Sequence, residues 1–179
     1  MRRRDVLPLL SSGMLGFLAG RPARAATQAG DVYSILQRDG DFSRWKDMVD
    51  RCGLASLLQG PGPFTLFALT DYALSVGQDL SIPPRGVQMA PEPRRRIRLL
   101  LEAHILEGVH DLAELSASSR TYTNLAGGLM SVTRNKFNIT VSWESAVSSA
   151  EGTLLSAPFV ARNGLVYPIG PLVAQPFKP

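Results

Sequence analysis

The first 25 residues have the composition of an export signal, and this limits the part of the chain that is left to fold. Arginines open the segment, a short apolar stretch follows over 8–20, and Ala23 and Ala25 form the small-x-small pattern that signal peptidases cut. The apolar stretch is shorter than the roughly 20 residues needed to cross a bilayer. The pattern therefore predicts a signal peptide over 1–25 that is cleaved before Ala26.

Arg3 and Arg4 indicate the export route. They are followed by one polar residue, Asp5, and then by Val6 and Leu7, which fits the twin-arginine pattern. An ordinary secretory signal is the alternative. Either route predicts a periplasmic or secreted location in a bacterium rather than the cytoplasm.

The basic character of the chain belongs to its signal segment. The net charge is +4 over 179 residues, but the first 25 residues hold five arginines and one aspartate, so the remainder is neutral. A neutral remainder gives no electrostatic argument for binding nucleic acid or anionic lipid. Its length suits one domain, which we expect over 31–177 after a short lead-in over 26–30.

The chain has one cysteine, so it cannot form an internal disulfide and its domain depends on its core. Cys52 follows Trp45, Met48 and Val49 at the spacing of an apolar helix face. This spacing favours a buried small hydrophobic side chain. A reactive thiol or a bond to another chain is the alternative.

Apolar spacing of three and four residues predicts helices in the first two thirds of the chain. Asp41 is placed to cap a helix that runs to about Cys52, and Gly53 is placed to end it. Thr70 and Asp71 are placed to cap the turn that follows a buried strand. The expected helical segments are Val32–Leu36, Asp41–Cys52, Leu54–Leu58, Tyr72–Val76 and Arg94–Leu106.

Strands are expected mainly in the last third. Phe137, Ile139 and Val141 alternate with polar residues, as in a sheet with one buried face. Pro168 lacks a backbone donor, which predicts that its strand is an edge strand or ends there. The expected strands are Phe64–Ala68, Thr121–Leu125, Leu129–Thr133, Phe137–Ser142, Leu154–Val160 and Leu165–Ile169. Helices followed by strands predict an α+β fold.

Four segments, in the same order, resemble the motifs of the fasciclin domain. Phe64–Leu74 resembles the first motif, Thr-x-Phe-Ala-Pro-Thr-Asp-x-Ala-Phe, and Leu100–Gly108 resembles the central Tyr-His segment. Thr123–Gly127 resembles the Thr-x-Leu-x-Gly turn, and Asn163–Ile169 resembles the closing Asn-Gly-x-Val-His-x-Ile motif. The resemblance as a whole extends over about 32–176.

The resemblance implies a compact domain, a β-wedge or sandwich packed with several α-helices. It also implies extracytoplasmic adhesion or interaction rather than catalysis. The chain departs from the motifs at Leu69 (usually proline), Leu74 (phenylalanine), Ala103 (tyrosine), Tyr167 (histidine) and Gly170 (aspartate). The motif residues that we expect to be structural are Thr65, Phe67, Thr70, Asp71, His104, Asn163 and Gly164.

The two histidines are the main candidates for other chemistry. His104 lies on the apolar face of its predicted helix, which favours a buried imidazole that ties the helix to a neighbouring strand or loop. Metal binding or acid–base work is the alternative. His110 is expected on a surface loop, and no acidic or cysteine cluster has metal-ligand spacing with either histidine.

A run of arginines opens the helix predicted from Arg94. Arg94, Arg95, Arg96 and Arg98 oppose the helix dipole there, so they need another explanation than helix stability. A solvated face paired with nearby glutamates is the simpler interpretation. The alternative is a contact for an anionic envelope polymer or lipid headgroup, made by Arg94, Arg95 and Arg98.

The sequence favours binding over catalysis. It has no nucleophile elbow, no phosphate-binding loop and no dinucleotide glycine pattern, so we expect no enzyme, cofactor or metal. The first hypothesis is an exported interaction or adhesion module for an envelope or extracellular protein or polymer. The second is a periplasmic carrier of a small apolar ligand, with a proline-rich lid over 81–93 and a lining of Met48, Met89 and Met130.

Overall fold

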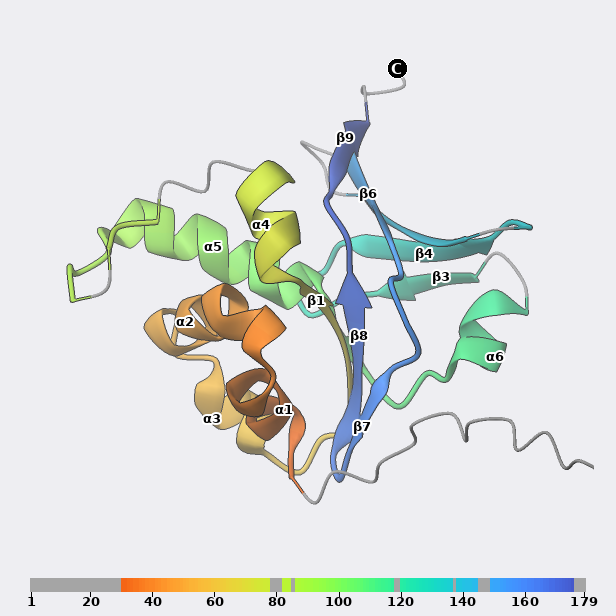
Figure 1. The fold of residues 1–179 in the computed structure, drawn as a ribbon, viewed down its shortest axis with the longest axis horizontal. Helices are drawn as coiled ribbons and strands as arrows, with labels where there is room; N and C mark the ends of the chain where they lie inside the picture. Colours follow the sequence, from red (N-terminus) through yellow and green to blue (C-terminus); the bar gives the residue numbers. More distant parts are fainter. Residues whose placement is uncertain are drawn as a thin grey trace, which may run out of the picture.

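The protein consists of two β-sheets with helices packed around them (Figure 1). The computed structural model describes residues 30–77, 82–84, 86–117, 120–136, 138–144 and 149–175. The predicted signal residues Arg3, Arg4, Ala23 and Ala25 lie outside these ranges. The architecture confirms the expected α+β class.

The first sheet is built on a parallel pair of strands that are far apart in sequence. Its order is β2-β1-β8-β7, and β1 pairs with β8 in parallel from Phe64↔Gly164 onward. Every residue of β1 and β8 is buried. Both strands are therefore continuous apolar runs, as expected for parallel strands covered on both faces. The bounds are β1 Phe64–Leu69, β2 Ile105–Glu107, β7 Phe159–Ala161 and β8 Gly164–Ile169.

The second sheet is antiparallel, with the order β3-β4-β5-β6-β9. An isolated bridge between Leu154 and Ile169 links the end of β6 to the end of β8, where the two sheets meet. The bounds are β3 Arg120–Thr123, β4 Leu129–Arg134, β5 Ile139–Glu144, β6 Ser149–Thr153 and β9 Val173–Gln175.

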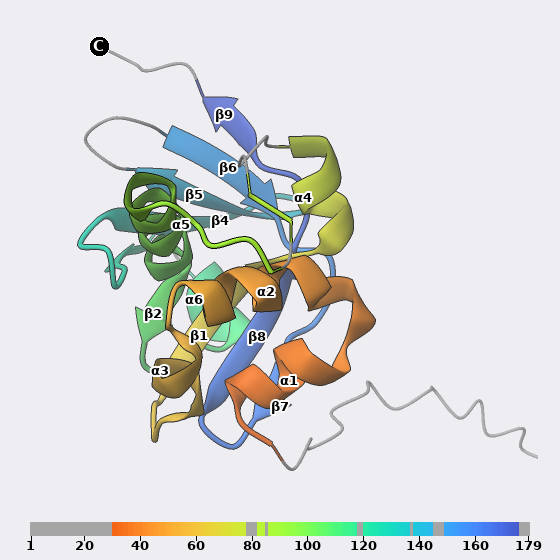
Figure 2. The same ribbon diagram turned by 90° about the vertical axis from the view of Figure 1, so that its left-hand side faces the viewer.

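The helices lie mainly on one side of the first sheet. Figure 2 shows α1, α2 and α3 in front of β1 and β8, with α4 and α5 alongside. The short helix α6 lies on the other side, against β4 (Figure 1). The bounds are α1 Val32–Arg38, α2 Ser43–Arg51, α3 Ala55–Gln59, α4 Asp71–Gly77, α5 Pro91–Ala103 and α6 Leu112–Ser116, with a 3-10 turn at Gly40–Phe42.

Large aromatic side chains fill the space between the helices and the first sheet. Phe42 and Trp45 enter from the helical side, and Phe67 and Tyr167 from β1 and β8; none is more than 1% exposed. Cys52 is fully buried beside them, which confirms its predicted role as a small core residue.

The strands of the last third differ from expectation. Residues 155–158 are not part of a strand; the expected strand over 154–160 is divided between the bridge at Leu154 and β7. Strands β6 and β9 were not predicted. Strand β8 is not an edge strand, because it pairs with β1 on one side and β7 on the other, but it does end at Ile169, directly after Pro168. Pro168 is tolerated because the β7 ladder ends at Val166.

Helix boundaries also differ from expectation. Helix α5 begins at Pro91 rather than Arg94, so the end of the expected proline-rich lid is helical. Helix α5 ends at Ala103, and Ile105 and Leu106 enter strand β2, where they pair with β1. Asp41 does not cap α2; it lies inside the preceding 3-10 turn, and the cap of that turn is Asp39. Helix α2 instead receives its cap from another part of the chain, described below.

Candidate functional site

Asn163 is the centre of the polar network at one end of the parallel strands. Its Oδ1 accepts a hydrogen bond from the Val32 amide at 2.8 Å, which holds the start of α1. Its Nδ2 donates to the carbonyls of Leu58 at 2.9 Å and Gly60 at 2.7 Å, at the end of α3. The side chain is buried, so the three bonds together tie two helices to the turn before β8.

Gly164 allows the two parallel strands to start side by side. A Cβ at this position would collide with the backbone carbonyl of Phe64, the first residue of β1. The Phe64 amide also donates to the Asn163 carbonyl at 2.9 Å. The Asn-Gly pair therefore joins β1 to β8 as well as forming a turn.

Thr65 fixes the segment that follows β2. Its hydroxyl donates to the Gly108 carbonyl at 2.8 Å and accepts from the His110 amide at 2.9 Å. The Tyr167 hydroxyl donates to the His110 carbonyl at 3.0 Å. Burial raises the pKa of Tyr167, so the phenol stays protonated and continues to donate.

His110 is more involved than the expected surface residue. It is half-buried, its Nε2 lies 2.9 Å from the Glu107 carbonyl, and its Nδ1 lies 3.2 Å from the Glu114 carboxylate of α6. Its ring also packs against Tyr122 of β3. His110 thus connects the first sheet to α6 and the second sheet.

Thr70 and Asp71 cap two different helices. The Thr70 hydroxyl accepts from the Ala73 amide at 3.2 Å, at the start of α4. Asp71 Oδ1 accepts from the Arg44 amide at 2.8 Å, in the first turn of α2. We expected both to cap α4. The structure gives Asp71 to α2, because its carboxylate lies against the first turn of that helix, whose amides lack partners within the helix.

His104 lies in an aromatic cage at the end of α5. Its ring stacks on Trp143 of β5, with 4.4 Å between centroids, and meets the edge of Trp45 of α2 at 5.2 Å. Nδ1 lies 2.7 Å from the Leu100 carbonyl, so the hydrogen bond stays within its own helix. Burial lowers the pKa of His104 to about 4. The ring therefore connects a helix to a strand by stacking, and it is neutral near pH 7. Phe67 makes a similar core contact, stacked on Tyr167.

The arginines of α5 are exposed, and their contact with an anionic polymer or lipid headgroup stays a prediction. Arg98 pairs with Glu102 at 2.8 Å, and its guanidinium lies 3.5 Å from the Cys52 carbonyl. Arg94 and Arg95 are exposed. The Arg94 carbonyl is 3.6 Å from the Cys52 sulfur, and burial raises the pKa of that thiol.

Among the described residues, no three His, Cys, Asp or Glu side chains are grouped so as to hold a metal ion. Within the same residues, no helix combines the length and the apolar character needed to cross a membrane. The polar motif residues are instead engaged in bonds that hold the fold together.

A surface hollow of about 240 Å³ lies beside the β4–β5 hairpin. We call it the hairpin hollow; its lining is Leu112, Arg134, Asn135, Lys136, Asn138, Ile139, Leu154, Leu155 and Ser156. The hairpin hollow was not predicted, because the neutral total charge after the signal segment conceals the two neighbouring cations, Arg134 and Lys136. The Asn135-Lys136 turn between two strands was the only signal for it.

The methionines that we expected to line a carrier of an apolar ligand do not lie at the hairpin hollow. Met48 and Met130 are fully buried in the core, and Met89 packs against it. The carbonyls of Pro83 and Val87, in the expected lid, accept from Arg51 at 2.7 and 2.8 Å. None of these residues lines the hairpin hollow.

The fold and its internal polar network define an α+β domain that is held together by its motif residues. The family model of the fasciclin domain matches residues 40–173, and the chain belongs to the fasciclin-domain family. Fasciclin domains are generally non-enzymatic and are typically extracellular or secreted.

Relatives are similar to this chain over part of their length. The chain is 25% identical to human Stabilin-1 over 145 residues, which covers 81% of the chain and 5% of Stabilin-1. It is 29% identical to an uncharacterized Synechocystis protein, sll1735, over 48% of the chain and 60% of that protein. The chain thus spans only part of these relatives.

A solved structure supports the fold. The FAS1 domain pair of the insect cell adhesion molecule fasciclin I superposes with a TM-score of 0.61 at 13% identity, covering 82% of this chain and 51% of that one.

Proposed function

We propose that the chain is an exported interaction module that binds a macromolecular partner of the cell envelope or the extracellular space. The observation that carries this proposal is the use of the motif residues. Thr65, Thr70, Asp71 and Asn163 direct their polar atoms at backbone groups of the domain itself. Binding must therefore use the outer surface, and the insect molecule that shares the fold is a cell adhesion molecule.

The proposal includes export, for which the sequence supplies the support. The N-terminal 25 residues have the three parts of a signal peptide. A domain without a disulfide does not depend on an oxidising compartment to fold, so either export route suits it.

Photo-crosslinking in the native cell tests the proposal. A photoreactive residue replaces an exposed side chain, Tyr72 on α4 or Lys136 on the hairpin, and the adduct is identified by mass spectrometry. We expect a discrete protein or polymer adduct from at least one position. The matched control places the same residue at buried Met48, which should give no intermolecular adduct. Absence of any adduct from exposed positions around the whole surface would contradict the proposal.

A further inference from the structure

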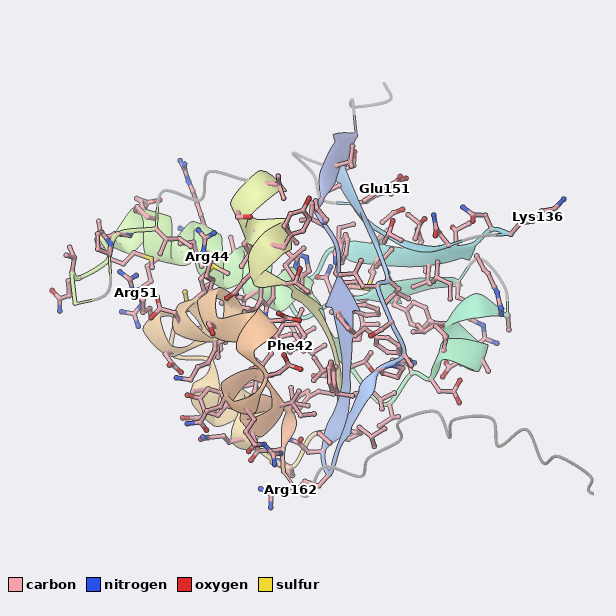
Figure 3. All side chains as sticks on the ribbon, in the orientation of Figure 1. Phe42, Arg44, Arg51, Lys136, Glu151 and Arg162 are labelled. Atoms are coloured by element: carbon pink, nitrogen blue, oxygen red, sulfur yellow. The ribbon has the colours of Figure 1, made fainter. Side chains whose placement is uncertain are left out.

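The hairpin hollow carries a local positive charge. Its rim holds Arg134 and Lys136, and none of the nine lining residues that the structure describes is acidic. Lys136 projects outward from the hairpin tip (Figure 3). Asp111 precedes Leu112 in the chain, but its carboxylate accepts from the Glu114 amide at 2.7 Å. A neutral domain with a local cationic rim attracts an anionic group to that place.

The floor of the hollow is aliphatic. Leu112 of α6, Ile139 of β5 and Leu154 after β6 are half-buried there, and Leu155 is 54% exposed. The floor is fixed to the sheets, because the Leu154 amide donates to the Ile139 carbonyl at 2.9 Å and the Leu155 amide to the Pro168 carbonyl at 3.0 Å. An aliphatic side chain of a ligand can therefore pack on a preformed surface.

Size and composition favour a peptide as the occupant. The hollow, at about 240 Å³, is smaller than the roughly 300–1,000 Å³ of typical small-molecule sites, so it suits one or two side chains. The exposed amide side chain of Asn138 carries both donors and an acceptor, which match a peptide backbone, while Asn135 Oδ1 accepts from the Asn138 amide at 2.8 Å and holds the turn.

We infer that the hairpin hollow binds an acidic peptide segment of a partner protein. A carboxylate lies at the rim formed by Arg134 and Lys136, and a neighbouring aliphatic side chain lies on the floor formed by Leu112, Leu154 and Leu155. This inference rests on the proposed function, since it assigns a surface and a chemical class to the macromolecular partner.

The test uses a fluorescent peptide of alternating leucine and glutamate, and the same peptide with glutamine in place of glutamate. Binding to the purified protein is followed by fluorescence anisotropy and by NMR. We expect the glutamate peptide to bind, to shift the amide signals of Asn138, Leu155 and Ser156, and to weaken with added salt. The glutamine peptide should bind roughly fivefold to tenfold more weakly, because two exposed ion pairs are lost.

Variants locate the site. The double variant Arg134→Gln/Lys136→Gln should lose the same fivefold to tenfold, and Leu155→Asn should weaken both peptides. The matched control, Arg38→Gln/Arg44→Gln, removes two exposed cations from α1 and α2 and should bind like the unmodified protein. No binding, equal binding of the two peptides, or equal losses in both double variants would overturn the inference.

Two further outcomes separate this inference from the proposed function. Tighter binding of a sulfated polysaccharide at the same amides would overturn the peptide assignment. A crosslinked partner that the Arg134→Gln/Lys136→Gln variant still captures in cells would overturn the hollow as the binding surface, while the proposed function would stand.

Discussion

His104 shows how a single buried side chain makes stability depend on pH. The imidazole is 2% exposed, and its Nε2 has no hydrogen-bond partner within the described structure. In the protonated ring the N–H at Nε2 would lack both water and an acceptor, although Nδ1 keeps its bond to the Leu100 carbonyl. Burial therefore lowers the pKa of the folded form to about 4 from 6.5.

We predict that this histidine destabilises the protein in mild acid. The unfolded chain binds a proton near pH 6.5, whereas the folded chain binds it only near pH 4. The contribution of neutral His104 to the free energy of unfolding is thus fully present above pH 6.5 and is lost as the pH falls toward 4. The free energy of unfolding should fall by about 2 kcal/mol at pH 5 and by about 3 kcal/mol at pH 4. Urea titrations across this range measure it.

His104→Leu provides the control for this prediction. At pH 8 the variant should be less stable by ~1–2 kcal/mol, because the bond to the Leu100 carbonyl and the stacking on Trp143 are lost. As the pH falls, the difference should shrink, since the variant has no imidazole to protonate. Parallel stability curves, or an undiminished melting temperature at pH 8, would contradict the structural role of His104.

Asn163 shows what the sequence could and could not predict about a single residue. The Asn-Gly pair predicted a turn, and a turn is present before β8. Its bonds to Val32 and to the end of α3 join residues more than 100 positions apart. Such long-range contacts depend on the packing of α1 and α3 against the first sheet, which local patterns do not specify.

Among the secondary structure elements, the start of α2 depends on a side chain from another element. Phe42 precedes the helix and provides no side-chain cap. Asp71, the first residue of α4, supplies the acceptor for the Arg44 amide at 2.8 Å instead. The negative carboxylate also interacts favourably with the positive end of the α2 dipole. One residue thus fixes the relative position of two helices at the end of β1.

We predict that Asp71→Ala lowers the free energy of unfolding by ~1 kcal/mol, because it removes this cap. Asp71→Asn should lose less, since the amide oxygen still accepts the bond. Asp41→Ala, at the position that the sequence favoured as the cap, should change stability by less than ~0.5 kcal/mol. Urea denaturation of the three variants measures the effect. A larger loss in Asp41→Ala than in Asp71→Ala would show that the cap is assigned to the wrong aspartate.

Strands that the sequence analysis missed have weak local patterns. Strand β6 contains Gly152, where a Cβ would lie 2.6 Å from Ile169 Cγ2, so close packing requires a glycine that lowers strand propensity. Strand β9 has three residues and pairs only with β6. In contrast, α5 and β4 were found because their apolar periodicity continues over longer stretches. The strands that were missed are determined by contacts between the sheets rather than by local sequence patterns.

At the scale of the whole molecule, the way in which the domain is stabilised bears on the route of its proposed export. The domain has no disulfide, and its only thiol is buried under the arginines of α5. The core of aromatic and aliphatic side chains can therefore form in a reducing cytoplasm. A domain that folds there suits the twin-arginine route, which carries folded proteins across the inner membrane.

We predict that replacing Arg3 and Arg4 by lysine stops export. In bacterial cells, the unmodified protein should be found in the periplasm or medium with Ala26 as its first residue, whereas the double variant should stay in the cytoplasm with its N-terminal segment uncut. Arg21→Lys, which lies outside the pair, is the control and should be exported normally. Cell fractionation with intact-mass measurement identifies both forms. A double variant that is exported and cleaved like the unmodified protein would assign the chain to the ordinary secretory route, and an uncut unmodified protein in the cytoplasm would refute the signal peptide itself.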